Sequence, residues 1–286
     1  MTGPHIAITD ETLTGRHGAL TIRRYAPAEV DGDATPLLWV HGGGFVQGSL
    51  RMLESSAVAT AVAEAGRVVW AASYHLAPMW NIFRAPRDGQ LKGNRFPLPV
   101  DDVSDAIRHV QERSPHGRFT LGGASAGACL TAAATLRLRD EGGQLPLSLV
   151  FAYGTFHATL PAQSPALEAQ LGGKTGFGSM NPAQAYKMNR NYAGSPDVMD
   201  NPYAFPGGHD LSGLPRTLMI DAFHDGLRAS GEAFSQELAA AGVPVDYSVV
   251  EGSNHGFLNT PKKPTFDVGI SRITDWLTAV DRSTQS

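Results

Sequence analysis

The chain alternates between short apolar runs and longer segments with helical periodicity. After residue 35, six runs of five to eight residues are mostly apolar and are bounded by Gly, Pro or Asp. They lie at 36–40, 67–73, 118–123, 147–153, 216–223 and 245–251. Runs of this length and composition predict strands that are buried on both faces of a sheet.

Between these runs, apolar residues recur at intervals of three and four positions, which is the spacing of one helix face. Two such stripes are Val100, Val103, Ile107 and Val110, and Ile270, Ile273, Leu277 and Val280. The segment 125–143 is also predicted to be a helix, because it is rich in Ala and Leu and ends at two glycines. The alternation predicts an α/β fold, with a mostly parallel central sheet and helices on both faces.

Three parts of the chain depart from this alternation. Residues 5–13 and 19–27 carry short patterned runs and are predicted to form an antiparallel hairpin. Residues 154–210 are rich in aromatic residues and Met and are too long for an ordinary connection, so we expect a cap inserted between two core strands. Residues 79–96 form a second long loop, which follows a strand end and is expected to reach the ligand side of the sheet. The whole chain, 1–286, is expected to be one domain with these additions.

Composition and charge exclude several functions. Hydrophobic residues make up 42% and charged residues 17% of the chain, and the net charge of −4 is not clustered, so no nucleic-acid partner is expected. Neither a signal peptide nor an apolar run of membrane-spanning length is present, which predicts a cytoplasmic protein with no membrane partner. Cys129 is the single cysteine, so no internal disulfide can form. Neither H-E-x-x-H, C-x-x-C nor a dinucleotide-binding glycine pattern occurs, so no metal and no cofactor are expected.

A glycine-rich stretch directly after a predicted strand carries the first candidate chemistry. The stretch HGGGF, residues 41–45, follows the run 36–40. Consecutive glycines are costly to order, but they suit a loop whose backbone N–H groups must approach a ligand closely, as an oxyanion hole requires. The alternative is a flexible glycine turn, which would not predict this position after a buried strand.

The stretch GGASAGA, residues 122–128, places Ser125 between a predicted strand and a predicted helix. A serine on such a sharp turn needs small neighbours, and Gly123 and Gly127 supply them. The turn also puts the N–H of Ala126 at the helix start, where the helix dipole favours a developing negative charge. By itself the pattern is weak, because glycine accounts for 32 of the 286 residues.

A serine hydroxyl needs a base to remove its proton, and the base needs a carboxylate to fix its tautomer. His255 follows the last predicted strand, and Asp221 and Asp225 lie at the end of the strand before it and in the loop beyond. The order Ser, Asp, His along the chain is the one expected of an α/β-hydrolase. Asp221 ends an apolar run and Asp225 lies deeper in the loop, and the residues themselves do not separate the two.

Several stretches together resemble one family over nearly the whole chain. HGGGF resembles the oxyanion motif of the hormone-sensitive-lipase-like α/β-hydrolases, the bacterial family IV esterases, and GGASAGA resembles their nucleophile elbow. Further stretches that resemble the family are YHLAP at 74–78, RFPLPVDDVSDA at 95–106, NPYAFP at 201–206, DGLR at 225–228 and HGF at 255–257. Because these motifs occur in the family's order, the chain is identified as a member by resemblance, with the α/β-hydrolase fold and an inserted cap.

This resemblance implies a serine carboxylesterase that hydrolyses short- to medium-chain acyl esters of small molecules through an acyl-enzyme intermediate. The roles it implies are nucleophile, acid and base for Ser125, Asp225 and His255, and oxyanion donors for Gly43, Gly44 and Ala126. Similar esterases often form homodimers through the last edge of the sheet, so a homodimer is one option for this chain.

The chain departs from the family pattern near the site. Ala124 stands where an acidic residue is usual, and Met79 stands where the family commonly has Glu. HGGGF begins at residue 41, which leaves little room for the N-terminal helical cap segment of related enzymes, so we expect the loop 79–96 to take over part of its task. The residues predicted to line the substrate pocket are Trp80, Phe83, Phe156 and Tyr186.

The same residues are compatible with other functions. A lactonase, a deacetylase or a formamidase acting on a specialised small metabolite would use the same three side chains, so the sequence does not separate these activities from an esterase. A non-catalytic ligand-binding protein on this fold is a further alternative, which the presence of both Ser125 and His255 disfavours.

Overall fold

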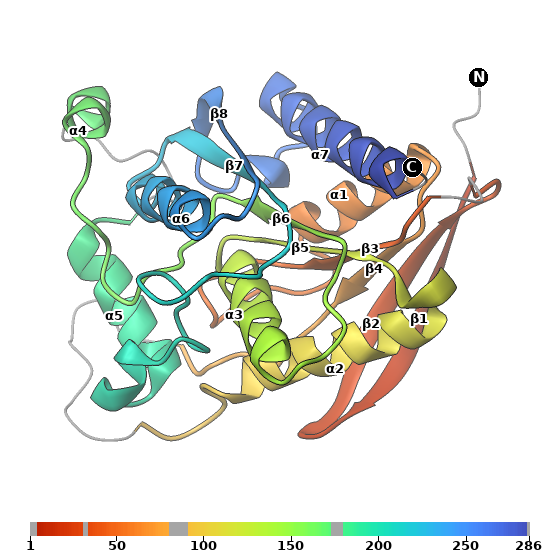
Figure 1. The fold of residues 1–286 in the computed structure, drawn as a ribbon, viewed down its shortest axis with the longest axis horizontal. Coiled ribbons are helices and arrows are strands. Elements are labelled where there is room, and N and C mark those ends of the chain that lie inside the picture. Colours follow the sequence, from red (N-terminus) through yellow and green to blue (C-terminus); the bar gives the residue numbers. More distant parts are fainter. Residues whose placement is uncertain (1–4, 31–33, 80–90, 173–179, 285–286) are drawn as a thin grey trace.

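One mixed β-sheet runs through the centre of the molecule (Figure 1). The computed structural model describes residues 5–30, 34–79, 91–172 and 180–284, and within them eight strands pair in the order β1-β2-β4-β3-β5-β6-β7-β8. The strands are β1 (Ile6–Gly15), β2 (Gly18–Pro27), β3 (Leu37–Val40), β4 (Val69–Ala72), β5 (Thr120–Ala124), β6 (Ser148–Ala152), β7 (Thr217–His224) and β8 (Val245–Asn254). From β4 to β8 all neighbours run parallel, which confirms the mostly parallel sheet predicted from the sequence.

The central strands form where the apolar runs predict them. Every residue of β3, β4, β5 and β6 is buried, whereas β1 and β8, at the two edges, expose many of their side chains. A strand in the middle of a parallel sheet is covered by helices on both faces, and this is why its sequence is continuously apolar.

The predicted N-terminal hairpin forms at one edge of the sheet. β1 and β2 pair antiparallel over their whole length and turn at Arg16 and His17. β2 then pairs antiparallel with β4, and Ile22 of β2 is buried in the core beneath it. The hairpin therefore extends the sheet at its β4 edge.

Seven α-helices lie in the described part of the chain. They are α1 (Leu53–Glu64), α2 (Leu98–Arg113), α3 (Ala126–Asp140), α4 (Pro165–Leu171), α5 (Pro182–Ala193), α6 (Arg228–Ala240) and α7 (Pro264–Ser283). α1 and α7 cover one face of the sheet, and α2, α3 and α6 cover the other (Figure 1). Across the described residues no helix combines the length and the apolar character that a membrane span requires.

The two apolar stripes predicted from the sequence become the buried faces of α2 and α7. Their fully buried members are Val100, Val103, Ile107 and Val110 in α2 and Ile273, Leu277 and Val280 in α7. Ile270 is partly buried against the same cluster as the rest of the α7 stripe. Each helix thus places one apolar face against the sheet, and each also buries charged residues, such as Asp102 in α2 and Asp281 in α7.

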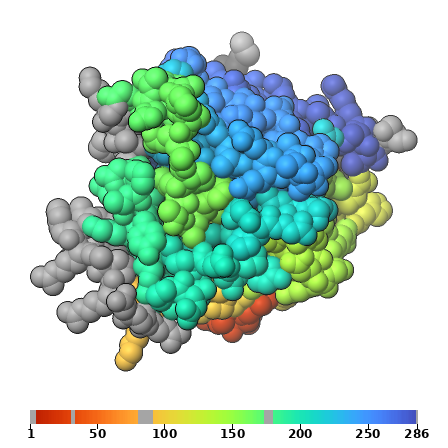
Figure 2. Space-filling model, turned by 60° about the vertical axis from the view of Figure 1, so that its left-hand side comes forward, coloured from red at the N-terminus to blue at the C-terminus, as the bar shows by residue number. Residues whose placement is uncertain are grey.

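The long connection between β6 and β7 contains α4, α5 and the short helix η2 (Pro196–Asp200). Asn181 and Gln184 form a capping box at the start of α5, and Gly194 ends that helix in the left-handed conformation. Tyr192 of α5 stacks its ring on Phe45 with centroids 4.0 Å apart. Figure 2 shows this connection, coloured green to teal, lying beside the blue α6 on the face turned to the reader.

The end of the segment predicted as a second loop, 79–96, is bound to α5. The N–H of Leu91 donates to the carbonyl of Gly194 at 2.7 Å, and the N–H of Phe96 donates to the carbonyl of Tyr192 at 3.1 Å. Residues 80–90 of this loop lie outside the described residues. The described residues at the end of this loop are therefore hydrogen-bonded to the connection between β6 and β7.

Candidate active site

Ser125 lies at the sharp turn between β5 and α3. Its φ of 52° and ψ of −117° are strained for a residue with a side chain. A Cβ at Gly123 would lie 2.6 Å from backbone atoms of Gly127, and a Cβ at Gly127 would lie 2.3 Å from the carbonyl oxygen of Val40. The G-x-S-x-G spacing is therefore a steric requirement of this turn.

The side chain of His255 reaches Ser125 from a distant part of the chain. His255 directly follows β8, and its Nε2 lies 3.0 Å from Oγ of Ser125. Its Nδ1 lies 2.5 Å from Oδ2 of Asp225, which lies in the loop between β7 and α6. With Nδ1–H donating to the carboxylate, Nε2 is free to accept a hydrogen bond from the serine hydroxyl. The structure thus brings three residues singled out from the sequence into one hydrogen-bonded row.

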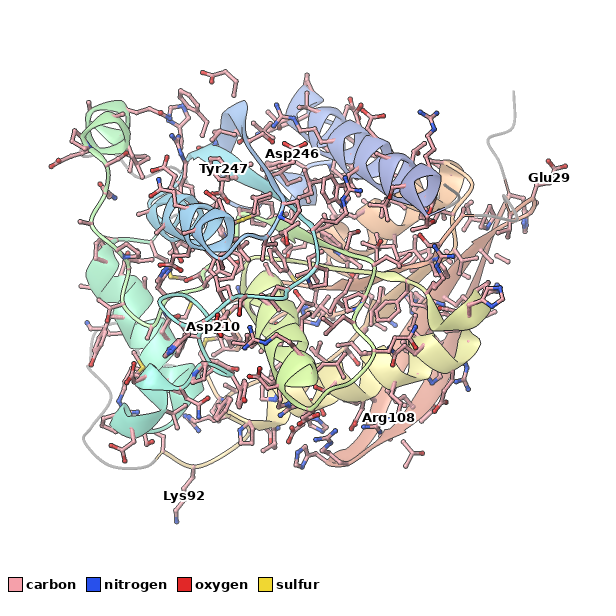
Figure 3. The ribbon with its side chains drawn as sticks, in the orientation of Figure 1. Glu29, Lys92, Arg108, Asp210, Asp246 and Tyr247 are labelled. Carbon is pink, nitrogen blue, oxygen red and sulfur yellow. The ribbon has the colours of Figure 1, made fainter. Side chains whose placement is uncertain are left out.

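Asp225, and not Asp221, contacts the imidazole. The second oxygen of Asp225 accepts the N–H of Leu227 at 3.0 Å, which fixes the carboxylate in its loop. Asp221 instead points to the face of β7 that α6 covers, where a Cβ at Gly231 would lie 1.9 Å from its carboxyl group. Tyr247 of the neighbouring β8, labelled in Figure 3, packs on this same face. Burial and the nearby Asp225 raise the pKa of Asp221 to about 8, so its carboxyl group is protonated at neutral pH.

The charges around His255 favour its protonated form. Burial by itself opposes a positive charge on the imidazole, but the carboxylate of Asp225 outweighs it. Glu54 acts in the same direction, as does Asp221 once it is ionised. The pKa of His255 is therefore raised above its ordinary value, which suits a group that must accept a proton from Ser125.

The loop HGGGF, residues 41–45, runs from β3 toward α1 and faces Ser125. Gly43 has a φ of 112°, and a Cβ there would lie 1.9 Å from the carbonyl oxygen of Gln47. That carbonyl cannot move away easily, because the N–H of Gln47 donates back to the carbonyl of Gly43 at 3.1 Å. A residue with a side chain at position 43 would therefore distort the loop.

Three backbone N–H groups lie near Ser125 and do not donate to any backbone carbonyl among the described residues. Among the described residues, neither Gly43 nor Gly44 donates its N–H to another backbone group. Ala126 is the first residue of α3, so its N–H has no acceptor within the helix. Gly43 and Gly44 line the same cavity as Ser125 and His255. These are the three residues that the sequence comparison with the esterase family singled out as oxyanion donors.

Two aromatic residues support this loop from beneath. Tyr74, from the stretch YHLAP, donates its hydroxyl hydrogen to the carbonyl of Gly42 at 3.1 Å. The ring of His41 stacks on Tyr74 with centroids 4.5 Å apart, and its Nδ1 lies 2.8 Å from the same carbonyl. Burial lowers the pKa of His41, so it is a neutral packing residue at pH 7.

One charged residue of the site, Glu54 of α1, is not among those predicted from the sequence. Its carboxylate accepts the N–H of Gly42 at 2.7 Å and the hydroxyl of Tyr153 at 2.9 Å. The available signal was an acidic residue in the first turn of a helix. That signal is weak, because acidic residues are common there for the helix dipole alone.

A cavity of about 490 Å³ opens beside Ser125. Among its described wall residues, Glu54 and His255 carry the only ionisable side chains. The apolar wall residues are Val46, Met52, Met79, Met180, Met188 and Leu227. Methionine is flexible and adapts to irregular apolar groups, so this wall suits an uncharged ligand of variable shape.

Two of the four aromatic pocket residues predicted from the sequence, Phe156 and Tyr186, require correction. Phe156 is fully buried, and its ring stacks on Phe234 of α6 with centroids 4.1 Å apart, so it packs the core and does not line the cavity. Tyr186 lies on the outer side of α5, with 45% of its surface exposed, and is also absent from the cavity wall. Trp80 and Phe83 fall outside the described residues. Methionines occupy the wall where aromatic residues were expected.

Within the part of the chain that the structure describes, His, Cys, Asp and Glu form no group of three or more that could hold a metal ion. Cys129 is buried in α3, where its Sγ lies 3.4 Å from the carbonyl oxygen of Ala204. Burial raises the pKa of this thiol far above neutral pH, so it packs as a neutral side chain.

Known proteins resemble this chain in sequence and in structure. A family model described as the alpha/beta hydrolase fold matches residues 92–259. The esterase LipI of Mycobacterium tuberculosis is 29% identical over 265 residues, which cover 89% of this chain and 76% of that protein. The ethyl acetate hydrolase of Pseudomonas putida is 30% identical over 265 residues, covering 88% of this chain and 76% of that protein. The crystal structure of an esterase from the bacterial hormone-sensitive lipase family has a TM-score of 0.79 at 26% identity, covering 95% of this chain and 84% of that one.

Proposed function

This chain belongs to the α/β-hydrolase fold family, in the hormone-sensitive-lipase-like branch of esterases, and from that premise we propose how its residues hydrolyse a carboxylic ester. The protein is a carboxylic ester hydrolase that acts on small-molecule esters. In our proposal Ser125 is the nucleophile, His255 is the base and Asp225 is the acid that orients the base. One observation carries the assignment: the unbroken row of hydrogen bonds from the serine hydroxyl to the buried carboxylate, beside an apolar cavity.

Acylation begins when Nε2 of His255 takes the proton from Oγ of Ser125. The serine oxygen then forms a bond to the carbonyl carbon of the ester, and the carbonyl electrons move to the oxygen. Asp225 stabilises the imidazolium that forms and keeps Nδ1 protonated. The imidazolium next donates its proton to the alcohol oxygen, and the bond between that oxygen and the acyl carbon breaks.

The negative charge of the tetrahedral intermediate rests, in this proposal, on the N–H groups of Gly43, Gly44 and Ala126. Such donors are already in place before the reaction, so they need no rearrangement when the charge develops. Loss of a single donor in an oxyanion hole typically slows the reaction by a factor of about 10²–10³. The start of α3 adds the positive end of its dipole at Ala126.

Deacylation repeats the sequence with water in place of the alcohol. His255 takes a proton from a water molecule, the hydroxide oxygen bonds to the acyl carbon, and the protonated imidazole returns its proton to Oγ of Ser125 as the acid leaves. The same residues therefore serve both half-reactions.

Replacing Ser125 with Ala tests the assignment of the nucleophile. Turnover of p-nitrophenyl acetate should be lost in S125A, and labelling by a fluorophosphonate should disappear with it, while the circular dichroism spectrum stays unchanged. Ser104→Ala is the matched control, because among the described residues Ser104 bonds to its own helix and to Arg137, and it does not line the cavity. S125A protein that still forms a covalent fluorophosphonate adduct would contradict the proposal.

The cavity supports an acyl chain of short to medium length as the preferred substrate. Its volume of about 490 Å³ is larger than an acetyl group needs, and its wall is largely apolar and uncharged. The relatives include an ethyl acetate hydrolase, whose name specifies a small ester of an acetyl group. We therefore expect activity from acetate upward, limited by the length that the methionine-lined wall can accept.

A series of p-nitrophenyl esters from acetate to laurate tests this preference. We expect kcat/KM to be highest between acetate and octanoate and to fall for laurate. Met52→Ala should shift the optimum to longer chains, because Met52 is part of the cavity wall, whereas Met199→Ala should not, because Met199 lies outside it. A rate that rises steadily up to laurate would contradict the proposed chain length.

Two expectations from the sequence are added to this proposal. A cytoplasmic location and a homodimer remain predictions. Sedimentation of the purified protein at micromolar concentration tests the second, with a mass near twice the 30.3 kDa of the chain expected for a dimer.

A further inference from the structure

Glu54 is a buried acidic residue in the wall of the active-site cavity, and the proposed reaction does not use it. It lies in the first turn of α1, with 2% of its surface exposed. A buried carboxylate is costly unless several donors satisfy it, so its partners indicate what it holds in place.

The carboxylate of Glu54 accepts hydrogen bonds from three groups. Oε1 accepts the N–H of Gly42 at 2.7 Å. Oε2 accepts the hydroxyl of Tyr153 and the side-chain amide of Asn259, each at 2.9 Å. The N–H of Glu54 in turn donates to Oδ1 of Asn259 at 3.0 Å. Because Oδ1 accepts this bond, the nitrogen Nδ2 of the same side-chain amide is the atom that donates to Oε2 of Glu54. Glu54 therefore acts only as an acceptor at its side chain, which is the behaviour of an ionised carboxylate.

The bond to Gly42 fixes the direction of the oxyanion loop. The Gly42 N–H points at Glu54, and the Gly42 carbonyl is held by Tyr74 from the other side. Both ends of this residue are thus occupied, so the loop cannot rotate about it, and the next two N–H groups, of Gly43 and Gly44, stay free of backbone acceptors. A Cβ at Gly42 would lie 2.6 Å from Oε1 of Glu54, so the contact also requires glycine at this position.

The bonds to Asn259 connect the same carboxylate to the loop that carries His255. Asn259 ends the short helix η3 (Phe257–Asn259), which begins two residues after His255. Its N–H donates to the carbonyl of Gly256 at 2.8 Å, so the loop is closed on itself next to the imidazole. One side chain on α1 thus connects the oxyanion loop, the end of β6 at Tyr153 and the histidine loop.

We propose that Glu54 is a positioning residue of this active site, which holds the oxyanion loop through Gly42 and the histidine loop through Asn259. The inference rests on the proposed function. It adds a second carboxylate, besides Asp225, on which the reaction depends.

The ionisable groups that pack against His255 or act on it through their charge come from four elements. They are Asp225 from the loop before α6, Asp221 from β7, Tyr153 after β6 and Glu54 from α1. Burial and the charge of Glu54 raise the pKa of Tyr153 well above its ordinary value, so Tyr153 stays neutral. Asp221 is protonated below about pH 8. Asp225 and Glu54 both act to raise the pKa of His255.

Glu54→Gln tests both parts of the proposal at nearly constant volume. An amide has one acceptor oxygen and one donor nitrogen, so wherever the nitrogen points it faces a donor, either the N–H of Gly42 or the amide of Asn259. We expect kcat for p-nitrophenyl acetate to fall at least tenfold with KM changed less than threefold. The acid limb of the profile of kcat/KM against pH should move to lower pH, because His255 loses a negative neighbour.

Glu54→Asp separates position from charge. Aspartate keeps the charge but is shorter by one methylene, so it cannot reach both Gly42 and Asn259 from the same place on α1. We expect E54D to lose kcat while the midpoint of its acid limb stays where it is in the wild type. This variant also carries the test if E54Q fails to fold, since unchanged kcat in E54D would overturn the anchoring role.

Asp281→Asn is the matched control. Asp281 is likewise a buried carboxylate with several donors, bonded to Arg67 at 2.5 Å and to the Thr35 hydroxyl at 2.6 Å, but it lies in α7 away from the cavity. D281N should lower Tm and leave both kcat and the pH midpoint unchanged.

The outcomes separate this inference from the function on which it rests. If E54Q keeps kcat within twofold of the wild type and the same pH midpoint, the positioning role is wrong. If the wild type hydrolyses the ester and S125A does not, the proposed function stands whatever the Glu54 variants do. If D281N shifts the pH midpoint as far as E54Q, the effect is general destabilisation, and the proposal is overturned.

Discussion

Oγ of Ser125 and Nε2 of His255 lie 3.0 Å apart, although 130 positions separate the two residues in the chain. Ser125 follows β5 and His255 follows β8, and both strands are parallel members of one sheet. The carboxyl ends of parallel strands lie at the same edge of a sheet, so residues that directly follow them can meet across other strands. The reactive contact therefore depends on the packing of the whole sheet.

Asp225→Asn should lower kcat by a factor of about 10³–10⁴, because an amide at this position favours the wrong tautomer of His255. The measurement is the initial rate with p-nitrophenyl acetate at saturating substrate. Asp246→Asn is the control: Asp246 is exposed on β8, labelled in Figure 3, and should keep the wild-type rate. A D225N rate within tenfold of the wild type would contradict the assignment of the acid.

The value of kcat/KM should rise with pH in proportion to the fraction of His255 that is unprotonated. Because the pKa of His255 is raised above 6.5, the imidazole is protonated and unable to accept a proton at pH values below its pKa. Activity on a neutral ester should therefore rise with pH and reach half its maximum above pH 6.5. Rates measured at constant ionic strength between about pH 5 and 9 check this, and a midpoint below about pH 6 would refute it.

Gly43→Ala should reduce kcat by a factor of about 100, because the new Cβ would lie 1.9 Å from the carbonyl oxygen of Gln47 and displace the oxyanion loop. Gly208→Ala controls for backbone strain alone: Gly208 also has a positive φ, of 83°, but a Cβ there meets nothing within 4 Å. G208A should lose some stability and keep its kcat. Equal losses of kcat in both variants would show that strain, and not the position of the loop, is responsible.

Asp221→Asn should stabilise the protein in a manner that depends on pH. The pKa of Asp221 is about 8 in the folded state against an ordinary value of 3.8. Below about pH 4 both states hold the proton, whereas between about pH 4 and 8 only the folded state does, so the aspartate costs stability that grows as pH rises. Asparagine does not titrate. The difference in unfolding free energy between D221N and the wild type should therefore be about 5 kcal/mol more in favour of D221N at pH 8 than at pH 4, because about four pKa units separate the two states. Urea unfolding at the two pH values measures this, and a gain independent of pH would contradict a buried neutral acid.

The strands, the main helices and the two glycine-rich turns could be predicted because each depends on residues close together in sequence. A run such as 147–153 is apolar throughout because both of its faces are covered. Gly123 and Gly127 are required by atoms of the turn that they flank. Patterns of this kind need no knowledge of distant parts of the chain.

The pocket could not be predicted in the same way. Phe156 and Tyr186 both lie in the aromatic connection between β6 and β7, yet one packs on α6 in the core and the other is exposed to solvent. Which side of a segment faces the cavity depends on how that segment docks on the sheet. Composition therefore predicted an apolar wall, but two of the residues to which it assigned that wall, Phe156 and Tyr186, do not line the cavity.

The sequence by itself determined the layered α/β architecture and the serine and histidine turns, because local periodicity and local steric fit encode them. The residues themselves left Asp221 and Asp225 open, and only the family resemblance implied Asp225. The tertiary structure decided which of the two contacts the imidazole, since Asp221 faces α6 and Asp225 faces His255. It also decided the place of Glu54, whose partners come from three other loops. The physical reason is that a hydrogen bond between distant residues depends on strand order and helix packing, which no short stretch of sequence contains.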